Sequence, residues 1–198
     1  MGANVYLAHP AAYGYKANGT TGDIIAHFVS RRAGERAAVR AFGFSAGSGA
    51  TSVYFMTETG KTTMSKAIAS AQTTAMALTA EPNSSNALAA SDYVAIELDN
   101  GTFQVVDVAT GGWSDFSIAE ATDRAILTGA DVYDFGAVAD SNVQAFKLAV
   151  STQTTKEQDG GLMYASGKNK AMLILHLNDT SANGWGSIDY VTIDYLNV

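Results

Sequence analysis

The chain has 198 residues, of which 47% are hydrophobic and 16% charged, and its formal net charge is −7. This composition is that of a globular protein long enough to bury a core, and its acidity disfavours a nucleic-acid binder, which needs a basic face to neutralise phosphates. The chain has no cysteine, which excludes disulfides and thiolate metal sites.

Residues 1–22 are rich in glycine and aromatic residues and follow neither a helical nor a strand period, so we expect an irregular N-terminal arm. The arm carries Tyr6, His9, Tyr13 and Tyr15 among alanines and glycines. Aromatic residues are enriched at protein–protein interfaces, and these four are therefore candidate contact residues. The arm lacks the basic and apolar regions of a secretory signal. No stretch of the chain approaches the roughly 18 apolar residues of a membrane span, so no membrane partner is expected.

Arginines are concentrated just after the arm. Four of the five in the chain are Arg31, Arg32, Arg36 and Arg40. A charge cluster is usually a solvated face, but in an acidic chain it also suits contact with an acidic partner surface. These arginines complete the candidate contact residues. The expected division is an arm with a basic segment over residues 1–40 and a β domain over residues 41–198.

The next segments have the composition of strands. Residues 23–29 form a short apolar run, and residues 37–44 and 51–57 read as two strands joined by a Gly- and Ser-rich link. Residues 62–78 are ambiguous, because their apolar positions fit a helical stripe while their end alternates as a strand does. We favour a strand over residues 74–79.

Asn100-Gly101 stands between two runs rich in β-branched and aromatic residues, which predicts a hairpin with a two-residue type I′ turn. That turn would place Leu98 opposite Phe103 and Ile96 opposite Val105, and opposite residues share a face of the sheet. The expected apolar patch therefore consists of Leu98, Phe103, Ile96 and Val105. Glu97 and Gln104 are expected on the other face.

Further elements follow toward the C-terminus. Residues 115–124 are expected to form one short helix, capped by Asp115 or Ser117. Strands are expected at residues 130–138, 143–150, 171–177 and 188–196, the third of them apolar on both faces and therefore central. The last strand is expected to alternate, with Val191, Ile193 and Tyr195 on one face and Tyr190, Thr192 and Asp194 on the other. Many short strands with frequent turn signals predict an all-β fold, an antiparallel sandwich or barrel-like domain with at most one or two short helices.

Residues 43–47 match the Gly-x-Ser-x-Gly motif of serine hydrolases, with Ser45 as the nucleophile. The later residues also follow the order of an α/β-hydrolase triad, because three aspartates and then a histidine come after the serine: Asp131, Asp134, Asp140 and His176. The context does not fit, because the residues after Ser45 do not favour the helix that the motif requires and His176 lies within an apolar strand. We therefore expect no enzymatic activity and keep a small serine esterase as an alternative. The spacing of the three histidines supports no zinc site, and no cofactor is expected.

Residues 87–103 read Ala-Leu-Ala-Ala-Ser-Asp-Tyr-Val-Ala-Ile-Glu-Leu-Asp-Asn-Gly-Thr-Phe. This run resembles a hairpin segment of tailed-bacteriophage virion proteins, in which it belongs to a small β domain that decorates or forms part of the capsid. Residues 132–136 and the run around Phe146 have a similar character. The resemblance implies a non-enzymatic structural protein. Its expected partners are the major capsid protein and sister copies, with a trimer favoured, and its expected location is the capsid surface after assembly in the host cytoplasm.

A third possibility is a carbohydrate-binding β-sandwich module of a phage fibre. Trp113 and Trp185 both lie in Gly-rich segments, where exposed indole rings would suit stacking on sugars. Burial as loop anchors is the alternative role for both tryptophans.

Overall fold

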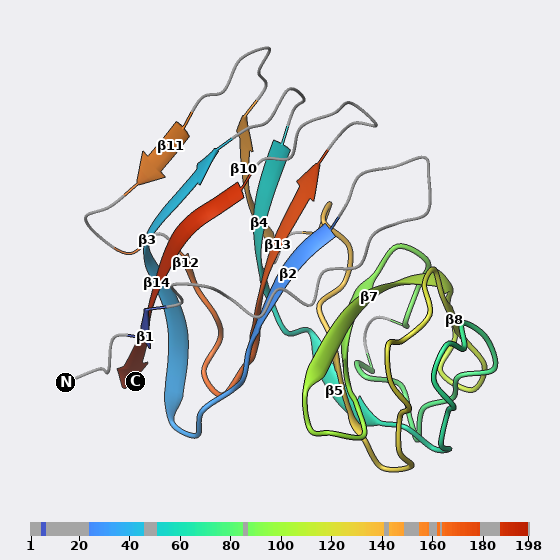
Figure 1. Ribbon diagram of the computed structural model, residues 1–198. Helices are drawn as coiled ribbons and strands as arrows, with labels where there is room; N and C mark the ends of the chain where they lie inside the picture. Colours follow the sequence, from blue (N-terminus) through green and yellow to red (C-terminus); the bar gives the residue numbers. More distant parts are fainter. Residues whose placement is uncertain are drawn as a thin grey trace. The chain divides into compact units, whose positions relative to one another are not determined.

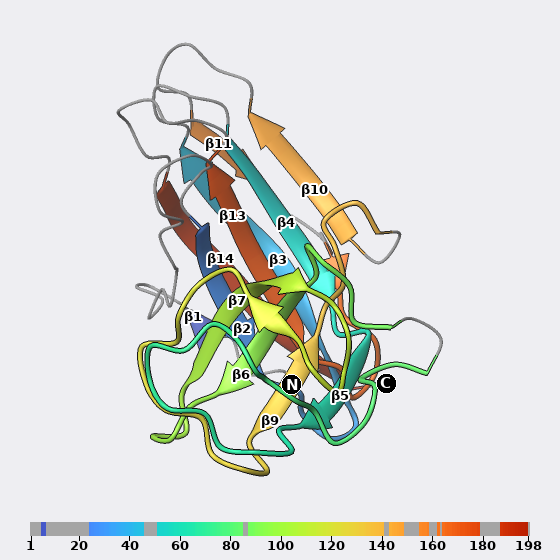
Figure 2. The same cartoon turned by 90° about the vertical axis from the view of Figure 1, so that its right-hand side faces the viewer.

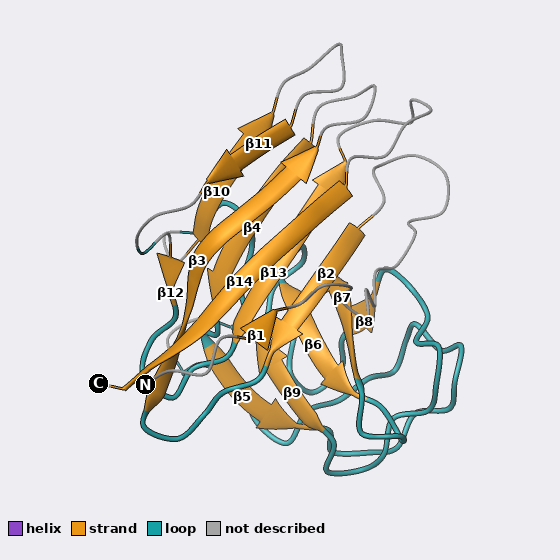
Figure 3. Ribbon diagram, turned by 60° about the vertical axis from the view of Figure 1, so that its left-hand side comes forward, coloured by secondary structure: helices purple, strands orange, loops and turns teal. Residues whose placement is uncertain are grey.

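The computed structural model describes residues 5–6, 24–45, 51–84, 87–140, 143–148, 155–158, 162, 164–178 and 187–197. In these ranges every regular element is a β-strand and every strand pairing is antiparallel (Figure 3). The predicted all-β class is therefore confirmed. The described part of the chain contains no helix of a length and hydropathy that would cross a membrane.

The chain divides into two compact units. The first consists of Met1–Thr57 together with Val143–Val198, and the second is Glu58–Asn142. The expected boundary at residue 40 falls within strand β3 (Glu35–Ser45), so the basic segment continues into a sheet of the first unit.

The first unit contains two sheets, which we call sheet A and sheet B (Figure 1). Sheet A has the order β1-β14-β3-β11, with β12 also paired to β3; its strands besides β3 are β1 (Val5–Tyr6), β14 (Ser187–Asn197), β11 (Thr155–Gln158) and β12 (Tyr164–Ala165). Sheet B has the order β10-β4-β13-β2, formed by β10 (Val143–Leu148), β4 (Thr51–Thr57), β13 (Met172–Asn178) and β2 (Ile24–Val29).

Alternate residues of both sheets build the core of the first unit. The cluster consists of Val29, Ala37, Val39, Val53, Phe55, Met172, Ile174, Val191, Ile193 and Tyr195. Tyr164 packs against it, its ring stacked on that of Phe55 with the centroids 6.0 Å apart. The alternation expected in the last strand is confirmed, because Val191, Ile193 and Tyr195 are buried. Strand β13 is central as expected, paired with β4 on one side and β2 on the other.

The second unit is built on one sheet, sheet C, with the order β5-β9-β6-β7-β8 (Figure 2). Its strands are β5 (Gly60–Thr63), β9 (Asp131–Asp134), β6 (Tyr93–Glu97), β7 (Phe103–Thr110) and β8 (Ser117–Ile118). One face of the sheet packs against long loops, and the buried cluster so formed is Met64, Ile68, Met76, Leu78, Leu88, Val94, Ile96, Leu98, Val106, Val108, Phe116, Ile118, Ile126, Ala130 and Val132.

Two elements expected in the second unit are absent. The strand expected over residues 74–79 is absent, because Ala75 has a left-handed backbone (φ +60°) that interrupts an extended run. Isolated bridges from Met76 to Phe116 and from Leu78 to Met64 stand in place of a continuous ladder. The helix expected over residues 115–124 is also absent. Phe116 and Ile118 are both buried while Ser117 between them is less so, which is the two-residue period of a strand.

The hairpin exists, but the expected register is wrong by one residue. Glu97 faces Phe103 and Ile96 faces Gln104. The Gly101 N–H donates to the carbonyl of Leu98 at 2.9 Å, and only Gly101 of the Asn-Gly pair has a positive φ, of +77°. This is a three-residue loop closed by a left-handed glycine, the next most common hairpin connection after the two-residue turn.

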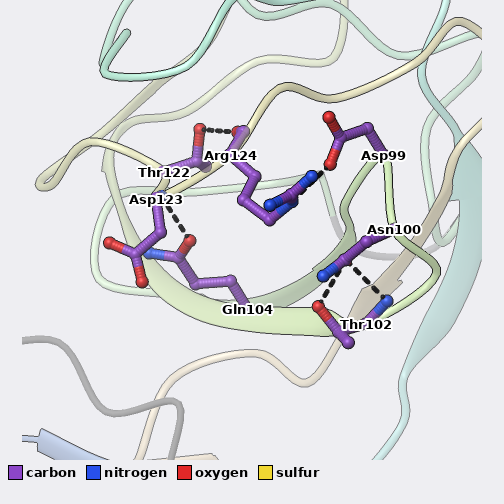
Figure 4. A network of polar contacts seen from close by, with 7 residues as sticks. All are labelled: Asp99, Asn100, Thr102, Gln104, Thr122, Asp123 and Arg124. Atoms are coloured by element: carbon purple, nitrogen blue, oxygen red, sulfur yellow. Dashed lines mark hydrogen bonds and ion pairs between the residues drawn. The ribbon is translucent and has the colours of Figure 1, made fainter.

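The side chains at the hairpin tip explain the choice of turn (Figure 4). The Asn100 Oδ1 accepts hydrogen bonds from the Thr102 N–H at 3.1 Å and from the Thr102 hydroxyl at 2.7 Å. Asn100 is therefore used as a side-chain acceptor within the turn, for which it needs no left-handed backbone. The one-residue shift moves Gln104 from the expected outer face into the core, where it is 3% exposed.

Gln104 fastens the loop that follows β8 to the hairpin. Its Nε2 donates to the carbonyl of Ala121 at 3.3 Å, and its Oε1 accepts from the Asp123 N–H at 2.9 Å (Figure 4). An ion pair between Arg124 Nε and Asp99 Oδ1 at 2.6 Å adds a second connection at the hairpin tip.

Replacement of Gln104 by leucine is expected to destabilise the second unit by roughly 1–3 kcal/mol, because a buried N–H and a carbonyl each lose their partner. Chemical denaturation monitored by circular dichroism measures the change. Thr102→Val serves as the control, since its bonds to Asn100 are at the exposed turn. Equal stability of Gln104→Leu and the wild type would show that Gln104 does not hold this loop.

Candidate protein–protein interface

The predicted contact residues of the arm are only partly within the described structure. Tyr6 lies in β1, directly opposite Thr192 of β14. His9, Tyr13 and Tyr15 lie outside the described residues. The arm thus contributes a two-residue strand to sheet A.

The four clustered arginines lie on or next to the same sheet. Arg31 and Arg32 are in the turn between β2 and β3, and Arg36 and Arg40 are on β3. Strand β14 pairs with β3 on one side and with β1 on the other (Figure 3). The structure therefore places Tyr6 and the arginine cluster on or next to one sheet, in which β14 lies between β1 and β3.

Arg32 lies over an aromatic ring of β14. Its guanidinium carbon is 3.6 Å from the centroid of the Tyr195 ring, and its Nη1 is 4.0 Å from Glu35 Oε2. The Arg32 side chain is 45% exposed. A cation over an aromatic face at an exposed site contributes about 0.5–1 kcal/mol. These contacts orient a guanidinium that solvent or a partner still reaches.

Arg40 is bound within the sheet. Its Nε donates to Asp194 Oδ2 at 3.1 Å, and both side chains are partly buried. The pairing of β3 with β14 shifts between Thr192 and Ile193, where Arg40 is the extra residue of β3. Bulges of this kind redirect a side chain, here toward Asp194. Arg40 therefore connects β3 to β14, whatever other contacts it makes.

No sequence pattern indicated Asp194 and Tyr195 as members of this region. The alternation of the last strand correctly assigned them to opposite faces, but no local signal identifies Arg40, 154 positions before Asp194, or Arg32 as their neighbours. Only the pairing of β14 with β3 brings these residues together.

The residues of the serine hydrolase alternative lie in different sheets and in different units. Ser45 is the last residue of β3, opposite Ser187, and the described chain resumes as strand β4. His176 is in β13 of sheet B, opposite Val53 and Ile25. The three aspartates that follow the motif, Asp131, Asp134 and Asp140, all belong to the second unit. The strand–turn–helix context that gives a nucleophile elbow its geometry is thus not present in the described residues.

The three aspartates separate into two environments. Asp131 forms an ion pair with Lys61, with 2.6 Å between Oδ2 and Nζ. Asp134 and Asp140 instead interact electrostatically with each other and with Asp92, whose pKa is raised to about 6, first by burial and then by these two charges.

Each carboxylate of the second environment accepts hydrogen bonds from nearby groups. Asp134 accepts from Thr59 and from the Gly136 N–H, Asp140 from the Ala137 N–H, and Asp92 from the Ala89 N–H. Among the described residues no group of three or more His, Cys, Asp or Glu side chains is arranged to hold a metal ion.

Of the two tryptophans considered for sugar stacking, Trp113 is 41% exposed and Trp185 lies outside the described residues. The carbonyl of Trp113 accepts a hydrogen bond from the Leu78 N–H, so its backbone is part of the loop framework of the second unit.

Comparisons of the chain with protein-family models, with curated proteins and with solved structures find no match.

Proposed function

We propose that this chain is a non-enzymatic structural protein of a tailed-phage particle, which decorates or cements the capsid through protein–protein contacts. The observation that carries the proposal is the segment 87–103, whose sequence resembles a virion hairpin. This segment includes β6 and leads into β7, and β6 lies in the middle of sheet C with a strand on each side. The resembling residues thus form the centre of the second unit.

The proposed contact surface is the part of sheet A that carries Tyr6 and the arginine cluster. Arginine and tyrosine are the residue types most often found at interface hot spots. Arg32 is held by Tyr195 and Glu35 before any partner arrives, so little side-chain entropy would be lost on binding. The proposed partners are an acidic surface of the major capsid protein and sister copies of the chain, with a trimer as the favoured assembly.

Purified particles of a phage that encodes this chain test the proposal. The chain is expected to remain with intact capsids through gradient purification, in a fixed ratio to the shell protein measured by quantitative mass spectrometry. Light scattering of the isolated protein gives its oligomeric state. Absence from particles, or trace amounts without a fixed ratio, would contradict a structural role.

The double substitution Arg31→Ala with Arg32→Ala is expected to weaken capsid binding by roughly tenfold or more, because hot-spot arginines contribute more than 1 kcal/mol each. Binding of the variant should also depend less on salt concentration, since two charges no longer attract the partner. Sedimentation with capsids at two salt concentrations measures both effects. An unchanged salt dependence would place the contact elsewhere.

A separate assay addresses the esterase alternative. The chain is expected to show no turnover of short-chain nitrophenyl esters, because Ser45 ends a strand and is followed by another strand at Thr51. Turnover that disappears in Ser45→Ala would identify an enzyme.

A further inference from the structure

Two acidic side chains of the second unit lie on neighbouring segments. Asp107 is on β7, and Glu120 follows β8, which pairs with β7. The Ala119 N–H donates to the carbonyl of Asp107 at 2.9 Å, which fixes the backbone beside Glu120 against β7. Glu120 is only 6% exposed.

Each of these carboxyl groups has an oxygen without a hydrogen-bond partner. Glu120 Oε2 and Asp107 Oδ1 are both buried, and among the described residues nothing donates to either. Buried carboxylates are normally paired or hydrogen-bonded, because an ionised group without a partner is costly in a protein interior. Two neighbouring carboxylates also repel each other, which raises this cost further.

The basic side chains of the second unit are engaged elsewhere or exposed. Lys61 pairs with Asp131, Arg124 pairs with Asp99, and Lys66 is exposed. From β6 the residue opposite Asp107 is Tyr93, with Glu97 further along the same face. Asp92, next to Tyr93, interacts with Asp134 and Asp140. The surroundings of the pair are thus neutral or acidic.

We propose that Asp107 and Glu120 form a proton-binding site, in which the pair holds one proton near neutral pH. The bound proton removes the repulsion between the two carboxylates. Loss of this proton leaves two neighbouring negative charges and loosens the segment after β8 from β7. The site makes the stability of the second unit respond to pH.

The electrostatics of the pair agree with this geometry. Burial, followed by the charge of Asp107, raises the pKa of Glu120 to about 7. Burial also raises the pKa of Asp107. Both groups bind a proton more tightly in the folded chain than in the unfolded chain. Glu120 therefore does not reduce the free energy of unfolding below its unfolded-state pKa near 4.5. The free energy of unfolding falls as the pH rises through the folded-state pKa of Glu120, which is about 7.

Carbon-13 NMR titration of the side-chain carboxyl groups in the full chain tests the proposal directly. The Glu120 carboxyl is expected to titrate near pH 7, and in Asp107→Asn its midpoint should fall, because the neighbouring charge is gone. Titration of Glu120 below pH 5 in the wild type, or the same midpoint in both proteins, would contradict the proposed proton-binding site.

Urea denaturation at pH 5.5 and pH 8 gives a second, independent readout. Glu120→Gln should reduce the rise of the unfolding constant between these pH values by roughly tenfold or more, since each unit of pKa shift corresponds to a factor of ten. Asp115→Asn removes the same charge from an exposed position and should leave the pH dependence as in the wild type.

Calcium or magnesium added at pH 8 distinguishes a proton site from a cation site. Neither ion is expected to change the unfolding constant of the wild type more than that of Glu120→Gln. Selective stabilisation of the wild type by either ion would replace the proton with a metal and overturn the proposal, as would a wild-type pH dependence in Glu120→Gln.

Discussion

Deletion of residues 2–21 is expected to abolish binding of the chain to capsids, or its assembly with sister copies, while both units remain folded. The described core residues of both units all lie outside the deleted segment. The deletion removes β1, which contributes only the pairs of Val5 with Ile193 and Tyr6 with Thr192 to sheet A. The remaining strands of sheet A retain their pairing through β3 and β14.

The loss of binding is expected to be large because the arm concentrates aromatic residues that form no core of their own. Ordering a segment of this kind costs roughly 1–2 kcal/mol per residue, so only an extensive docked surface would hold it. Sedimentation with capsids and light scattering measure binding and assembly, and circular dichroism checks the fold. The matched control keeps the length of the arm but replaces Tyr6, Tyr13 and Tyr15 by alanine. Wild-type binding and assembly by the truncated chain would exclude the arm from the interface.

Strand alternation predicted much of the fold correctly because it depends on neighbouring residues only. The last strand illustrates this, with Val191, Ile193 and Tyr195 on the buried face as expected. The strand expected over residues 171–177 was likewise expected to be central. Residues 171–175 are fully buried, and β13 pairs with a strand on each side. A run that is apolar on both faces fits only a strand covered on both sides.

The hairpin shows where local information becomes insufficient. Asn-Gly is compatible with the two-residue turn and also with a three-residue loop that has glycine in the left-handed position. The chain adopts the second, in which Asn100 bonds to Thr102. The resulting shift places Gln104 in the core, and the partners that satisfy it there, Ala121 and Asp123, come from a loop about 17 residues later.

Residues 62–78 were ambiguous because buried positions in loops follow no regular period. Met64, Ile68 and Leu78 are buried, as the helical stripe suggested, yet they are held by isolated bridges. Met64 bridges to Leu78 within the segment, and Ile68 bridges to Ile126. The left-handed backbones of Ala71 and Ala75 allow the chain to change direction between these bridges. Left-handed alanine is uncommon, so neither propensity nor periodicity indicates it.

The interface candidates were predicted as residue types, whereas their contacts depend on tertiary structure. The arginine cluster was apparent from the sequence, but its partners Tyr195 and Asp194 are brought to it only by the pairing of the last strand with β3. The Asp107–Glu120 pair had no sequence signal. Isolated carboxylates in an acidic chain are usually solvated, and only the packed loop reveals that Glu120 is buried together with one oxygen of Asp107.

Replacement of Phe55 by alanine is expected to give the largest loss of stability of any single substitution considered, about 3–5 kcal/mol. Phe55 is fully buried in β4, within the cluster between sheets A and B, and its ring stacks on Tyr164. Alanine would remove this contact and leave a cavity that the surrounding strands cannot fill without moving.

Chemical denaturation, followed by NMR signals of β3 and β14, measures this loss in the first unit itself. Leu162→Ala is the matched control, because Leu162 belongs to the same unit but is 53% exposed, and its truncation should change stability by less than about 0.5 kcal/mol. Similar stability of the two variants would show that Phe55 does not support the sandwich. Since sheet A forms one side of this core, Phe55→Ala should also weaken capsid binding, in proportion to the fraction of chains whose first unit is unfolded. Arg31→Ala with Arg32→Ala, by contrast, should weaken binding in fully folded chains, and this difference separates loss of the contact residues from loss of the sheet that holds them.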